Sequence, residues 1–185
     1  MEKKDQKMPI ASREINVGKK KNAKFPIEFG SHESTCLIIS SCFFLVPALY
    51  AFLSFGMYPY GILSVVTTKV SVNYWRHADY GTLSRTADLI MSKFSFVLYF
   101  LSGSYFFLQE PWLFAIGVPG CLAIIFCFHY AGVLWDRDSS NWVYLHMSFH
   151  LFVALQQTLV IYGGVLTNAG NLFYSICMYW GYRCP

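Results

Sequence analysis

The sequence predicts an all-α fold: a polytopic bundle of about five transmembrane helices, with a sixth left open, behind a short basic tail. Hydrophobic residues make up 55% of the 185 residues and charged residues only 13%, about half the charged fraction of an ordinary soluble domain. Apolar runs of about 20 residues, the length that crosses a bilayer, alternate with short polar segments. A soluble core of this size has too little interior to bury so many aliphatic and aromatic side chains.

Residues 1–34 are predicted to be a disordered, basic, cytoplasmic tail, followed by a transmembrane helical domain over residues 35–185. The tail mixes lysine with Glu, Asn, Gly and Pro and has no hydrophobic periodicity, which is typical of a segment that does not fold alone. Its lysines account for the formal net charge of +4. Next to a membrane span, such a charge indicates attraction to anionic lipid, and no nucleic-acid partner is expected.

The first two spans are predicted to form a hairpin. The first covers residues 35–55 and is almost purely apolar, although Pro47 is expected to kink it. Residues 56–59 between the two spans are too few to form another element, so we expect a tight turn there. The second span, residues 58–77, is more polar because Lys69 interrupts it.

Three further spans follow a polar segment at residues 78–86. We expect them at residues 87–107, 112–135 and 142–162, where the apolar runs are again long enough to cross a bilayer. The remaining run, residues 165–180, is shorter. It is compatible with a sixth span, a re-entrant segment or an interfacial helix.

Arginines predict the orientation of these spans. If the tail is cytoplasmic, Arg76, Arg85 and Arg137 also fall on the cytoplasmic side, and the opposite connections carry no Lys or Arg. This asymmetry is the one that the positive-inside rule describes. We therefore expect a multi-pass integral membrane protein with a cytoplasmic N-terminus, in an endomembrane such as the ER or Golgi.

Polar residues recur at helical spacing inside three of the spans. Such stripes usually join helices by hydrogen bonds, and we interpret the serines, Tyr99 and Gln157 in this way. The stripes comprise Lys69, Asn73 and His77 on the second span, Asp88, Ser92, Ser95, Tyr99 and Ser102 on the third, and His146, His150 and Gln157 on the fifth.

The histidines favour a metal site. His146 and His150 form an HxxxH pair that presents both imidazoles to one point, and His77 and Asp88 are expected at a similar depth. Three neutral imidazoles with an open position suit catalytic zinc, which activates a bound water. Asp88 is then expected to fix an imidazole tautomer or act as general base, and Asn73 to donate a hydrogen bond to a developing oxyanion.

This constellation resembles the superfamily of alkaline ceramidases, adiponectin/progestin-type receptors and hemolysin III-like proteins. The family pattern is Ser-x3-His at the end of the second helix, an Asp shortly after, and HxxxH in the last helix. His77, Asp88, His146 and His150 match it, and the step from His77 to Asp88 is similar to that of the ceramidase branch. The resemblance implies zinc held by the three histidines and hydrolysis of a lipid amide within the membrane.

Two features of the chain differ from that family. Asn73 stands at the serine position, four residues before His77. One span separates the Asp88 helix from the HxxxH helix, whereas the family has three there, so the number of spans is lower than the family's seven.

Two other functions remain open at this point. The first is a non-catalytic membrane scaffold or sensor, in which the polar stripes only pack helices. The second is a haem-binding electron carrier, in which histidines on different helices clamp iron and His129 is an additional ligand. The expected partners are membrane lipid, both as solvent and as substrate, and, in an oligomer, a second copy of the chain.

Overall fold

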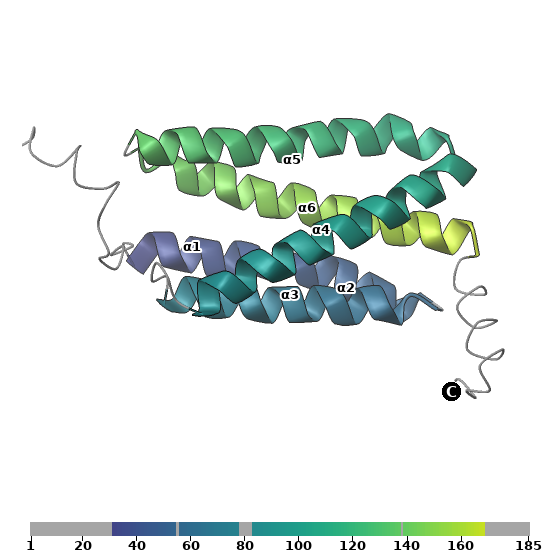
Figure 1. Cartoon of the computed structure of the whole chain (residues 1–185), viewed down its shortest axis with the longest axis horizontal. Helices are drawn as coiled ribbons and strands as arrows, with labels where there is room; N and C mark the ends of the chain where they lie inside the picture. The colour runs from purple at the N-terminus through teal and green to yellow at the C-terminus, as the bar shows by residue number, and fades with distance from the viewer. Residues whose placement is uncertain (1–30, 55, 78–82, 138, 169–185) are drawn as a thin grey trace, which may run out of the picture.

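The computed structural model describes residues 31–54, 56–77, 83–137 and 139–168 of the chain. Within these ranges the fold is all-α, as the sequence predicts (Figure 1). The elements are α1 (Ser31–Ser41), a 3-10 turn η2 (Cys42–Phe44), α2 (Leu45–Leu53), α3 (Tyr58–His77), α4 (Leu83–Gln109), α5 (Trp112–Asp136) and α6 (Trp142–Leu166).

The first three elements follow one another without a break and form one rod. The 3-10 turn η2 lies just before Pro47, which is near the start of α2. Proline has no N–H to donate to the carbonyl of Phe43, four residues earlier. A short 3-10 turn is a common response to such an interruption, so the irregularity expected from Pro47 occurs on its N-terminal side.

A tight turn joins α2 to α3, as expected for a hairpin. Gly56 in this turn has a φ of 78°, a left-handed conformation that glycine adopts without steric cost. Pro59 lies in the first turn of α3, where no intrahelical donor is lost. Met57, between the two helices, is almost completely buried and anchors the turn to the core.

Four helical segments of the described chain are long and apolar enough to cross a membrane: His32–Leu53, Leu83–Gln109, Trp112–Asp136 and Trp142–Leu166. Helix α3 has 20 residues, also enough to cross a bilayer, but Lys69 and Asn73 make it more polar. Its bounds coincide with those predicted for the second span. The polar connection at residues 78–82 and a sixth span lie outside the described residues, as does the tail over residues 1–30.

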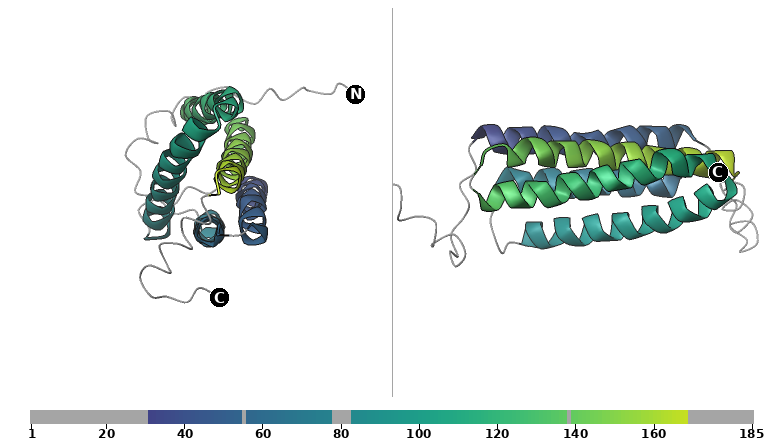
Figure 2. Two further views of the ribbon diagram at one scale, coloured as in Figure 1. Left: turned by 90° about the vertical axis from the view of Figure 1, so that its right-hand side faces the viewer. Right: turned by 90° about the horizontal axis from the view of Figure 1, so that it is seen from above.

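The helices pack as a bundle with α6 at its centre. Helix α5 runs along the length of α6, and α6 also contacts α1, α2 and α4. Helix α4 crosses the bundle obliquely, next to α5 at the connection between them and next to α3 at its other end (Figures 1 and 2). Helices α4 and α5 therefore diverge away from their connection.

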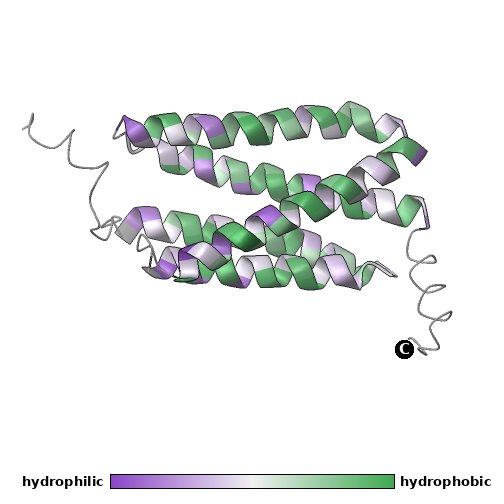
Figure 3. Ribbon diagram, viewed as in Figure 1, coloured by the Kyte–Doolittle hydropathy of each residue, from purple (hydrophilic) through white to green (hydrophobic). Residues whose placement is uncertain are grey.

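The outer faces of the helices are apolar. Helix α5 is hydrophobic along most of its length, whereas hydrophilic segments interrupt α4 (Figure 3). Large side chains such as Leu101, Leu108, Leu122 and Ile125 are mostly exposed. In water these surfaces would be unfavourable, but in a bilayer they face lipid tails, which agrees with the predicted membrane domain.

Hydrogen bonds between side chains join α3 to α4. They link Tyr60 to Ser102 (2.7 Å), Ser64 to Tyr99 (2.8 Å) and Thr67 to Ser95 (2.9 Å). In a membrane, each such bond contributes about 0.6 kcal/mol on average. The packing role that we predicted for Ser95, Tyr99 and Ser102 is confirmed.

Two glycines of α5 offer a test of this packing. A Cβ on Gly117 would clash with the Phe107 ring of α4, whereas one on Gly132 would meet nothing within 4 Å. We expect Gly117→Ala to destabilise the bundle by about 1–3 kcal/mol because the ring has to move. Gly132→Ala should be neutral or stabilise it by up to about 1 kcal/mol. Unfolding in detergent measures both, and equal effects would contradict the packing described for α4 and α5.

Candidate functional site

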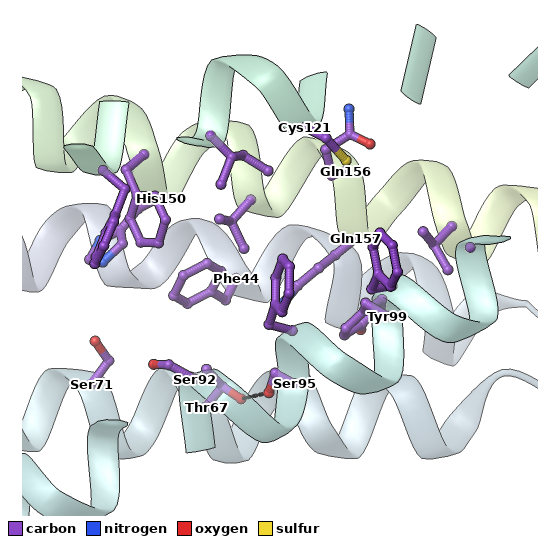
Figure 4. Close-up of a pocket in the computed structure, with 18 of the residues that line it drawn as sticks. Phe44, Thr67, Ser71, Ser92, Ser95, Tyr99, Cys121, His150, Gln156 and Gln157 are labelled. Atoms are coloured by element: carbon purple, nitrogen blue, oxygen red, sulfur yellow. Dashed lines mark hydrogen bonds between the residues drawn. The ribbon is translucent and has the colours of Figure 1, made fainter. Parts of the chain in front are cut away.

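A cavity of about 490 Å³ lies between α4 and α5. Helices α3 and α6 form its inner walls, and Phe44 of η2 also lines it. Most of its lining side chains are apolar, but polar groups gather near one end, which we call the Ser31 end because α1 begins there. Figure 4 shows His150 and Ser71 on opposite sides of this part of the cavity.

The cavity reaches the outer surface between α4 and α5. Phe96 and Phe100 of α4 and Val118 and Leu122 of α5 line the cavity and are also more than half exposed. Because these two helices diverge away from their connection, the opening faces sideways, toward the layer that lipid tails would occupy. The cavity is therefore accessible to an alkyl chain from the bilayer.

His146 and His150 lie together on the first turns of α6. Their ring centroids are 4.7 Å apart, as expected for an i, i+4 pair on one helical face. Aromatic rings surround them: Trp75 of α3 is 5.3 Å from His146, and Phe44 is 5.2 Å from His150. The pair therefore lies in an environment that contains little water.

Ser40 of α1 orients the ring of His150. Its Oγ lies 2.9 Å from Nδ1 of His150 and 3.1 Å from the carbonyl oxygen of Leu37. The carbonyl can only accept, so Ser40 donates its proton there and accepts one from Nδ1–H. This assignment leaves the lone pair on Nε2 of His150 available to a metal ion or an acid.

A second chain of hydrogen bonds reaches Asp88 of α4. The Oγ atoms of Ser41 and Ser71 are 3.1 Å apart, and Ser71 in turn bonds the Asp88 carboxylate. Ser41 also donates its proton to the carbonyl oxygen of Leu37 (2.8 Å), so the single proton of Ser71 is shared between the Asp88 carboxylate and the Oγ of Ser41. Adjacent serines of α1 thus support both His150 and Asp88.

One carboxylate oxygen of Asp88 remains without a partner. Its Oδ1 is buried and has no hydrogen-bond partner among the residues that the structure describes. Buried carboxylate oxygens are usually hydrogen-bonded, because desolvation without a partner is costly. Asp88 lines the cavity with His146 and His150, so this oxygen is available to a group bound there.

The structure brings together three of the five site residues that we predicted. Asp88, His146 and His150 line the same cavity. Asn73 is exposed on the outer face of α3 and does not line it, so the structure does not place it at this site. The backbone of His77 ends α3, but its side chain lies outside the described part of the chain.

Ser71, two residues before Asn73, faces the cavity where Asn73 does not. It is 3% exposed and lines the cavity. Sequence reasoning also missed Ser40 and Ser41, which are fully buried. The available signal was an adjacent pair of hydroxyl groups inside an otherwise apolar span, since such groups have to find partners within the protein.

Two further predictions concern metal groups. Among the described residues, no cluster of three or more His, Cys, Asp or Glu side chains is placed to hold a metal ion. A three-histidine site therefore depends on His77. His129 of α5 is exposed and is not among the cavity-lining residues, so it is not positioned to clamp a haem iron opposite His146 or His150.

Comparison of the chain with protein-family models, with curated proteins and with solved structures finds no match. The described residues of the site are two adjacent imidazoles and a half-buried carboxylate with one buried, unpaired oxygen, all beside a largely apolar cavity.

Proposed function

We propose that the protein is an integral membrane, zinc-dependent hydrolase that acts on a lipid amide or ester. The observation that carries this proposal is the position of Asp88, His146 and His150 within one largely apolar cavity. Hydrolysis needs a base that takes a proton from water and a group that polarises the substrate carbonyl, and a lipid substrate needs an apolar path to reach them. The cavity offers the groups and the path together.

The proposed zinc ligands are His146, His150 and His77. Nε2 of His150 is left free by the bond to Ser40, and His146 lies beside it, whereas the third ligand has to come from the end of α3. Zinc held by these three imidazoles would lower the pKa of a coordinated water to about 7 and would polarise the substrate carbonyl.

Asp88 is the proposed general base. Its free oxygen Oδ1 can accept a proton from a water molecule, and Ser71 holds the other carboxylate oxygen in place. The aromatic rings around the histidines exclude water other than the molecule that reacts. Electrostatic interactions within the site are stronger as a result. The same carboxylate can return the proton to the leaving amine or alcohol.

The cavity determines the class of substrate in this proposal. An alkyl chain enters sideways between α4 and α5, past Phe100 and Leu122, which border the opening. Its polar group then reaches the histidines at the Ser31 end. A substrate that stays in the bilayer needs no path through water, so lipids are favoured over soluble amides.

The orientation belongs to the same proposal. Arg76, Arg85 and Arg137 lie at the Ser31 end of the bundle, and the described connections at the other end carry no Lys or Arg. By the positive-inside rule the Ser31 end is cytoplasmic. The reacting groups then lie one to two helical turns inside the cytoplasmic surface of an endomembrane.

A non-catalytic scaffold is the second candidate, and a specific observation favours it. The hydrogen bonds from Ser64, Thr67 and Tyr60 to α4 show that much of the polar stripe serves to pack helices. In this alternative, His150 and Asp88 would extend the same packing through Ser40 and Ser71. A bound metal distinguishes the two functions, because packing alone requires none.

The test uses the full chain purified in detergent. We expect about one zinc per chain by elemental analysis, together with release of fatty acid from an N-acyl lipid amide. A folded protein without zinc would contradict the hydrolase proposal and would favour the non-catalytic scaffold. Iron with a Soret absorption band would instead support the haem-binding carrier.

A further inference from the structure

A second polar position lies deeper in the cavity, at Gln157 of α6. This residue lies two helical turns beyond His150 on the same face, and both line the cavity. Gln157 is only 5% exposed, and its Oε1 has no hydrogen-bond partner among the described residues. Figure 4 shows its side chain inside the cavity, near Tyr99. The packing role that we predicted for Gln157 is therefore not seen at this oxygen.

Two polar residues of α4 that line this part of the cavity, Tyr99 and Ser95, are already paired. The Tyr99 hydroxyl bonds Ser64 and the carbonyl oxygen of Tyr60, and Ser95 bonds Thr67. The cavity wall also contains apolar side chains such as Phe107, Val153 and Val160, together with Ser92, Ser104 and Gln156. Since an unpaired buried amide is costly, the missing partner is expected from the molecule that occupies the cavity.

We propose that Gln157 recognises a hydroxyl group on the alkyl chain of the lipid that binds in this cavity. A carboxamide offers one acceptor and one donor group, and a hydroxyl can pair with either of them. A carbonyl or an ether oxygen could only accept, and would leave Oε1 unpaired. This inference rests on the proposed function only for the position of the lipid's polar head.

The spacing on α6 places the hydroxyl along the chain. The seven residues from His150 to Gln157 rise about 10.5 Å along the helix. With the polar head at the histidines, the hydroxyl lies roughly eight to nine carbon–carbon bonds along an extended chain, near its ninth or tenth carbon. A hydroxyl next to the head would instead lie near Asp88 and the histidines. The position of the hydroxyl on the chain therefore decides whether it can bind Gln157.

Three matched probes test the proposal: octadecanamide, the same amide with a hydroxyl on its tenth carbon, and the same amide with a hydroxyl on its second carbon. Binding to the full chain in detergent is measured by native mass spectrometry, with all three probes in competition. We expect the wild type to bind the tenth-carbon probe about tenfold more tightly than octadecanamide, the value of one hydrogen bond. The second-carbon probe should show no such gain.

Variants assign the preference to one side chain. Gln157→Leu should bind octadecanamide as well as the wild type does and lose the tenfold gain. Gln156→Leu changes the adjacent glutamine, which also lines the cavity, and should keep it. Equal binding of the three probes by the wild type would overturn the proposal, as would a gain that survives in Gln157→Leu or disappears in both variants.

This result can be separated from the proposed function. The measurement records binding and not turnover, and it can be repeated in a His146→Ala/His150→Ala background. Suppose that this variant and the wild type both lack zinc but still prefer the tenth-carbon probe. The hydrolase proposal is then wrong, and Gln157 still recognises the hydroxyl. If zinc and hydrolysis are found without any preference, the hydrolase holds and this inference fails.

Discussion

Replacing His146 and His150 together with alanine should abolish zinc binding and hydrolysis in a protein that remains folded. The two residues are neighbours on α6, with ring centroids 4.7 Å apart, and provide two of the three proposed ligands. A single remaining imidazole cannot hold zinc against water, because catalytic sites use three protein ligands. Zinc per chain should fall from about one to background, and fatty-acid release should fall with it.

The matched control is His129→Ala. His129 is exposed on α5 and does not line the cavity, so its removal should leave zinc content and turnover unchanged. The double variant His146→Gln/His150→Gln preserves side-chain volume in case the alanines disturb packing, and size-exclusion profiles report folding for each protein. A folded double variant that keeps its zinc would show that the metal is bound elsewhere.

The helices were predictable because their signals are local. Each apolar run had the length that a bilayer requires, and turn residues such as Gly56 and Pro111 separate the runs. The second span was predicted with the bounds that α3 has. The oblique course of α4 was not predictable, because it depends on how Gly117 and Phe107 pack between helices.

The site was predictable within each helix but not between helices. The spacing of His146 and His150 shows that they share a face whatever that face meets. Lys69 and Asn73 also share a face, but it is the outer face of α3. Ser71, which is two residues from Asn73 and therefore about 200° away around the helix, faces the cavity instead.

The rotation of α3 decides which of these residues can act. That rotation is set by long-range contacts, including the bond between Ser41 and Ser71 and the bond from Ser34 to the carbonyl oxygen of Trp75. Neither partner on α1 carries a sequence signal that points to α3. The partners of these serines could therefore be identified only after the helices were packed.

Asp88→Asn should nearly abolish turnover while the protein keeps its zinc and its fold. The amide can still accept the bond from Ser71, so packing is preserved, but it cannot take a proton from water. Loss of a general base typically lowers the rate by about 100-fold to 10,000-fold. Turnover and zinc content measured on the same preparation separate this effect from loss of the metal.

Ser71→Ala and Asn73→Ala form a matched pair on α3 that tests the same mechanism. Ser71 orients the Asp88 carboxylate, so its loss should lower turnover about 10-fold to 100-fold, as for other residues that support a catalytic group. Asn73 faces outward and its loss should change nothing. The sequence alone assigned Asn73 a different role, a hydrogen bond to a developing oxyanion, so a loss of turnover in Asn73→Ala alone would show that α3 is rotated in the active protein. Equal activity of both variants would instead show that Asp88 needs no support from α3, and the hydrogen-bond chain through Ser41 would then serve packing alone.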